Sequence, residues 1–195
     1  YEIIGIASWI RKSLDNLDRG YGASAGYSSV SQNIDWINQN NPLKEISSTA
    51  DGIWEDALNW DGSFYPNNFY NVESGQAFND VSARYYEVIL AHNKILNSSV
   101  EIDKLTVNSL GSLEVSQSSF LNVLLDTNIN GGSIANNGVL NFNELTLNNG
   151  IINNHLDINV TNDVNVIKGE LNTNGTITGK TLTIDNGIIS GEGIA

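Results

Sequence analysis

The sequence contains no cysteine, which excludes disulfide bonds and metal sites built on thiolates. Basic residues are also scarce, since 9 Lys and Arg stand against 22 Asp and Glu, giving a net charge of −13. This balance excludes nucleic acid as a partner, because nucleic-acid binding needs a basic surface, and it disfavours adhesion to anionic lipid. No apolar run approaches the length of a membrane span.

Proline and most aromatic residues lie in the first part of the chain. Both prolines and all four tryptophans lie at or before Pro66, and the only aromatic residues after residue 86 are Phe120 and Phe142. The second half is rich in Asn, Gly, Thr and branched aliphatic residues. We therefore expect two architectures in one chain.

A repeat organises the second half. Residues 145–152 read Leu-Thr-Leu-Asn-Asn-Gly-Ile-Ile, residues 182–189 read Leu-Thr-Ile-Asp-Asn-Gly-Ile-Ile, and residues 164–171 form a looser copy. Alternating apolar and polar residues broken by Asn-Gly turns indicate short strands, and a period near 20 indicates stacked coils. The anchors of the copies are Leu105, Leu124, Leu145, Val164 and Leu182.

The predicted fold is therefore mostly β. We expect a parallel β-helix of five to six coils, each of about 19 residues, over residues 87–195. Its hand is predicted as right-handed from the general rule for parallel crossovers. Leu105, Leu145, Val164 and Leu182 are expected to share one interior column, and Asn side chains are expected to form ladders at the corners.

Two blocks of the first forty residues resemble a known family. Residues 3–9 read Ile-Ile-Gly-Ile-Ala-Ser-Trp, and residues 27–37 read Tyr-Ser-Ser-Val-Ser-Gln-Asn-Ile-Asp-Trp-Ile. They resemble the substrate-binding strand, the closing strand and the C-terminal helix of trypsin-like serine proteases. The resemblance implies a C-terminal piece of such a domain over residues 1–41, with a helix beginning near Ser31. It also implies the following substrate-binding residues: Ser8, Trp9, Ile10, Ala25, Gly26 and Tyr27.

The resemblance implies backbone contacts from Ser8 and Trp9 to an extended polypeptide substrate and a pocket wall from residues 25–27. Ile10 stands where the family usually has Gly, so the pocket entrance would be narrow. No Gly-Asp-Ser-Gly motif is present, so we assign no catalytic residue to this chain and expect it alone to be inactive. A plain helical cap is the alternative, with residues 3–17 in a single helix.

The middle of the chain is predicted to contain a linker, followed by an entry segment that leads into the β-helix. Residues 42–51 are polar and are predicted as a linker, and residues 52–86 carry Trp54 and Trp60. This segment resembles the Trp-containing entry that precedes β-helical passengers of autotransporters. We expect the two tryptophans to plug the first coil, and the alternative is an aromatic platform for stacking sugars.

Candidate chemical groups in the rest of the chain are scattered. His92 and His155 are expected in solvated turns without metal-ligating partners, and we predict neither a metal nor a cofactor. The repeats resemble those of filamentous-haemagglutinin-like and autotransporter passengers, which implies a secreted or cell-surface protein with a possible host or cell-surface ligand. Three hypotheses follow: a fragment of an exported serine endopeptidase on a β-helical stalk, a structural or adhesive β-solenoid, and a carbohydrate-active β-helix.

Overall fold

The computed structural model describes residues 5–11, 24–29, 43–62, 64–68 and 86–192. The chain divides into two compact units, Tyr1–Pro42 and Leu43–Ala195, and each is described by itself. Within the described ranges, no helix is long and apolar enough to cross a membrane.

The first unit contains an antiparallel pair of strands, β1 (Gly5–Arg11) and β2 (Ser24–Ser29). Isoleucine and tryptophan in β1 favour extended backbone. The strand predicted for residues 3–9 is confirmed where it is described, and the alternative of one helix over residues 3–17 is wrong for residues 5–11. The helix expected from Ser31 lies outside the described residues.

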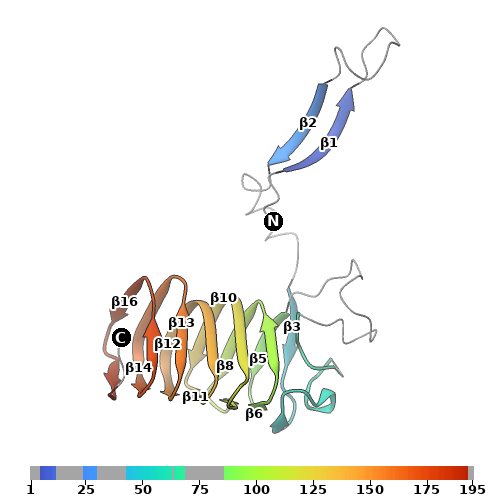
Figure 1. The fold of residues 1–195 in the computed structure, drawn as a ribbon. Coiled ribbons are helices and arrows are strands. Elements are labelled where there is room, and N and C mark those ends of the chain that lie inside the picture. The colour runs from blue at the N-terminus through green and yellow to red at the C-terminus, as the bar shows by residue number, and fades with distance from the viewer. Residues whose placement is uncertain (1–4, 12–23, 30–42, 63, 69–85, 193–195) are drawn as a thin grey trace. The chain divides into compact units, whose positions relative to one another are not determined.

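The second unit is a parallel β-solenoid of about 5 turns with about 19 residues in each turn (Figure 1). All pairs between its named strands are parallel, as the repeat predicted. Strands from successive coils stack in three sets, which we name the first, second and third faces. A single turn of 3-10 helix, η1 (Ala57–Asn59), is the only helix among the described residues.

The bounds of the strands show how each coil contributes once to each face. The first face contains β7 (Ser99–Ile102), the start of β10 (Phe120–Asn130), the start of β12 (Val139–Asn154), β13 (Asp157–Val160) and β15 (Thr176–Thr178). The second face contains β3 (Lys44–Ser47), β5 (Tyr86–Leu90), β8 (Lys104–Asn108), later parts of β10 and β12, the start of β14 (Asp163–Thr173) and β16 (Thr181–Ile184). The third face contains β4 (Gly52–Ile53), β6 (Asn93–Leu96), β9 (Ser112–Val115), β11 (Ser133–Asn136), the ends of β12 and β14, and β17 (Ile188–Ser190).

Matching side chains of successive coils form interior columns. The predicted column is confirmed, because Leu145 pairs with Val164 and Val164 pairs with Leu182. Its complete membership on the second face is Ile46, Val88, Leu105, Thr127, Leu145, Val164 and Leu182. All are buried except Leu182, which is 46% exposed because it belongs to the last described coil and no described coil covers it.

One anchor of the repeat was assigned wrongly. The repeat predicts Leu124 as the anchor of its coil, but it is 44% exposed, and the position equivalent to Leu105 and Leu145 is held by Thr127, which is 1% exposed. The register between β10 and β12 shifts between Val123 and Asp126, because this coil has one extra residue at its corner. The leucine side chains 124 and 125 therefore point out of the core, and a polar residue enters it.

The Asn-Gly pair of the repeat forms a tight corner. Asn149 and Asn186 both adopt positive φ values, 58° and 57°, which Asn tolerates better than most residues. A Cβ on the following Gly150 would lie 2.3 Å from Ile129 Cγ2, and one on Gly187 would lie 2.3 Å from Val166 Cγ1. Only Gly fits at these places, because the backbone runs directly over the coil beneath.

Asparagine ladders connect successive coils at their corners, as predicted. Inside the third face, Asn136 Nδ2 donates to Asn154 Oδ1 at 2.7 Å, and Asn154 Nδ2 donates to Thr173 Oγ1 at 3.1 Å. All three residues are buried. Since each of these polar groups has a partner in the next coil, the ladder can lie in the interior without a large desolvation cost.

The solenoid begins earlier than the sequence suggested. Residues 42–51 were expected to be a linker, but β3 lies among them and pairs with β5, and β4 pairs with β6. The first strands are short and polar, so their periodicity was hidden. A side chain binds the backbone of β3, since Asp61 Oδ1 accepts a hydrogen bond from Ser47 N. Glu55 Oε1 accepts a hydrogen bond from Asn97 N after β6 and so connects the first coil to the next.

We expect replacement of Thr127 by Val to stabilise the solenoid. Thr127 Oγ1 is buried without a hydrogen-bond partner. Valine keeps the shape and removes the unsatisfied hydroxyl, so the free energy of unfolding should rise by about 1 kcal/mol. Urea denaturation of both proteins measures it. Thr127→Ser keeps the hydroxyl and serves as the control, and a less stable T127V protein would show that the hydroxyl has a partner in solution.

Candidate functional site

Among the described residues, Ser48 and His92 come near each other, as a serine nucleophile and its histidine base would. His92 Nδ1 lies 2.8 Å from Ser48 O, so this nitrogen donates its proton to a carbonyl. Ser48 Oγ accepts hydrogen bonds from Ala91 N at 2.9 Å and His92 N at 3.1 Å. Ser48 Oγ also lies 3.4 Å from His92 Nδ1, but that nitrogen directs its proton at Ser48 O and so does not accept one from the hydroxyl. These contacts join two coils, and we assign the pair a structural role.

The second histidine, His155, lies exposed in the turn between β12 and β13, as predicted. Within the described ranges, no group of three or more His, Asp or Glu side chains is close enough to hold a metal ion. The acids from residue 101 onward are thus dispersed over the coils.

The six predicted substrate-binding residues all lie on β1 and β2. Backbone pairing places Tyr27 opposite Ala7, Gly26 opposite Trp9, and Ala25 opposite Ile10. The register shifts between Ala7 and Trp9, so Ser8 falls at an irregularity of β1. Their role toward a substrate stays a prediction.

The two tryptophans of the entry segment plug the core. Trp54 is fully buried and Trp60 nearly so, and their rings meet edge to face at 4.8 Å between centroids. Trp54 Nε1 donates to Pro66 O, and Trp60 Nε1 donates to Trp54 O. The alternative of a sugar-stacking platform is wrong, because neither ring face is open to a ligand.

A buried lysine, which the sequence analysis missed, lies beside this plug. Lys94 occupies an interior position of β6 in register with Leu113. Its ammonium group donates to Ala50 O and Asn59 O and lies 5.0 Å from the Trp60 ring centroid. Burial lowers the pKa of Lys94, and the charges of Asp51 and Asp56 oppose that shift. Alignment of residues 93–96 with 112–115 would have revealed it.

Asp103 is a second buried charge that the sequence did not single out. Its Oδ2 accepts hydrogen bonds from Tyr86 N and from Asn68 Nδ2, both at 3.0 Å. Burial raises the pKa of Asp103, and the two hydrogen bonds partly offset this. Asp103 thus ties the turn after β7 to the start of β5 and to residue 68, and we assign it a structural role.

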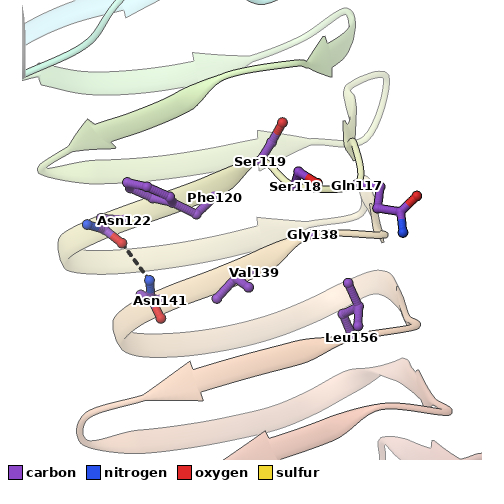
Figure 2. A pocket seen from close by; sticks show the side chains of 9 residues that line it. All are labelled: Gln117, Ser118, Ser119, Phe120, Asn122, Gly138, Val139, Asn141 and Leu156. Atoms are coloured by element: carbon purple, nitrogen blue, oxygen red, sulfur yellow. Dashed lines mark hydrogen bonds between the residues drawn. The ribbon is translucent and has the colours of Figure 1, made fainter.

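An open groove of about 510 Å³ lies on the outside of the first face. Figure 2 shows that it spans two neighbouring coils, with the turn at Gln117 and Ser118 at one end and Asn122 and Asn141 at the other. Phe120 and Val139 lie between these ends. The complete lining is Gln117, Ser118, Ser119, Phe120, Asn122, Gly138, Val139, Asn141 and Leu156.

An external amide ladder forms one border of this groove. Asn141 Nδ2 donates to Asn122 Oδ1 at 2.6 Å, as drawn in Figure 2, and Asn159 Nδ2 donates to Asn141 Oδ1 at 2.9 Å. Thr178 extends the ladder through Asn159. The ladder presents a regular row of uncharged donors and acceptors on the first face.

Comparisons with known proteins add no family to these observations. No family model matches the chain, and neither a curated protein nor a solved structure matches it. Function must therefore be argued from the solenoid and from its own surface.

The buried Asp103 predicts a pH dependence of stability. Its folded pKa lies above the ordinary 3.8, so between these two values the folded state binds the proton and the unfolded state has released it. Stability therefore falls as the pH rises through this window and stays lowered above it. Relative to Asp103→Asn, the unfolding free energy of the unaltered protein should drop from about pH 4 upward in urea titrations. Parallel pH curves for the two proteins would contradict the assignment.

Proposed function

We propose that this chain is a structural and adhesive segment of a secreted or cell-surface bacterial protein, with the solenoid as its stalk. The observation that carries this proposal is the continuity of the interior columns from β3 to β17. Each described coil contacts the next through backbone hydrogen bonds and matched side chains. Such an assembly gains length with every coil and keeps its cross-section.

The surface of the solenoid supports this role. The described ionisable side chains are spread over the coils, and the described ion pair between Lys104 and Asp126, at 3.6 Å, joins two partly exposed groups. The similarity of the repeats to haemagglutinin-like and autotransporter passengers supports export to the cell surface. We expect the coils to be right-handed, following the crossover rule.

A second candidate is the fragment of a trypsin-like endopeptidase on the same stalk. The antiparallel pairing of β1 with β2 supports it, since the resemblance implies two adjacent strands in this order. This candidate requires a nucleophile motif encoded upstream of Tyr1. Because Ile10 would narrow the pocket, the parent enzyme would cleave after small or medium side chains.

Insertion of whole coils tests the stalk. Residues 139–156 form one full turn, because Val139 pairs with Asp157 in the following coil. Three further copies inserted after Leu156 should fold and lengthen the particle by about 14 Å, given a spacing of about 4.8 Å between strands. Small-angle scattering measures the length, and circular dichroism measures the strand content.

A half-coil insertion provides the matched control. Three copies of residues 139–147 add residues of the same kinds, but each copy is only half a turn. Every later strand would therefore lie on a different face, and cooperative unfolding should be lost. Equal disruption by whole and half coils would contradict the proposed stalk, because a modular rod must accept complete turns.

A further inference from the structure

The groove on the first face differs in charge from the protein around it. The chain carries a net charge of −13, yet none of the nine residues that line the groove has an ionisable side chain. Along the two outward columns of this face, Glu101 precedes Asn122 and Asp157 follows Val139, whereas the neutral residues Ser99 and Asn159 hold the other two flanking positions. The groove is therefore a neutral area about 10 Å long over its two coils, with one carboxylate next to each end.

The floor of the groove is apolar. Phe120 and Val139 are adjacent in the paired strands β10 and β12, and each is half-buried. The Leu156 side chain projects beside them from the next corner and is 41% exposed (Figure 2). Together they form a partly exposed apolar strip along the floor of the groove.

The border of the groove offers paired hydrogen-bonding groups. A side-chain amide has two N–H donors and two acceptor lone pairs. Asn141 uses one donor toward Asn122 and one acceptor toward Asn159, so one of each remains. Asn122 is held in the same way, since its Nδ2 lies 3.5 Å from Glu101 Oε2. The ladder thus fixes both amides while leaving each able to bind a hydroxyl group.

We propose that this groove binds a neutral polysaccharide, and this inference rests on the adhesive part of the proposed function. A sugar ring would place its apolar face on Phe120 and Val139 and its hydroxyls on the Asn122 and Asn141 amides. An acidic polymer would be repelled by the neighbouring carboxylates, and the uncharged lining matches a neutral chain. The exposed side chains of Gln117 and Ser118 at the rim add polar contacts of the same neutral kind.

Binding to immobilised polysaccharides tests the inference. The neutral probes are glucan, mannan, galactan and N-acetylglucosamine polymers, and the acidic probes are polygalacturonate and hyaluronate. The full chain should be retained by at least one neutral polymer and by neither acidic one. Asn141→Asp introduces a charge and removes the donor, so affinity for the retained polymer should fall by at least about tenfold.

Asn172→Asp is the matched control. Asn172 has the same ladder role on the third face, donating to Asn153 Oδ1 and accepting from Ser190 Oγ, and it lies outside the groove. N172D should bind like the unaltered chain. Leu156→Ala, which removes only an exposed apolar contact, should weaken binding without disturbing the core.

Three results would overturn the inference: no retention by any neutral polymer, equal loss in N141D and N172D, or full binding by both N141D and Leu156→Ala. None of them would affect the proposed stalk, which is tested separately by whole-coil insertion.

Discussion

Each coil of the solenoid buries its apolar side chains only because another coil lies against it. A strand of four residues cannot form a core alone, and here the core consists of columns that pass from coil to coil. The same stacking supplies partners for backbone groups and for the amides of Asn136 and Asn154. The ends are therefore the weak points, and Trp54 and Trp60 cover the first one.

This constraint explains why part of the fold could be predicted. The repeats at residues 145–152 and 182–189 keep apolar residues at fixed intervals because each must meet its counterpart, so the parallel order and the Leu145 column followed directly. Thr127 was missed because a longer corner shifted the register and a threonine replaced an aliphatic residue. β3 and β4 were missed because short strands with exposed polar residues carry little periodicity.

The groove could not be predicted for a different reason. Asn122 and Asn141 are separated in the sequence and lie one above the other only because the coil length sets them in register, and Leu156 reaches the same groove from the next coil. The sequence predicted amide ladders in general, but not which of them would border an apolar strip. Lys94 is a partial case: aligning residues 93–96 with 112–115 reveals its interior position, but not its hydrogen bonds to Ala50 O and Asn59 O, which come from the coil before it.

The central claim is that matched columns between coils hold the structure together, and a pair of adjacent substitutions tests it most directly. Leu145 is fully buried in its column, whereas Thr146 lies next to it in β12 on the outer side. Denaturant unfolding of Leu145→Asp and Thr146→Asp compares the two positions. The account predicts a loss of more than about 3 kcal/mol, or of cooperative unfolding, for L145D, because its charge would be buried without a partner. It predicts less than about 1 kcal/mol for T146D. Equal effects at the two positions would contradict it.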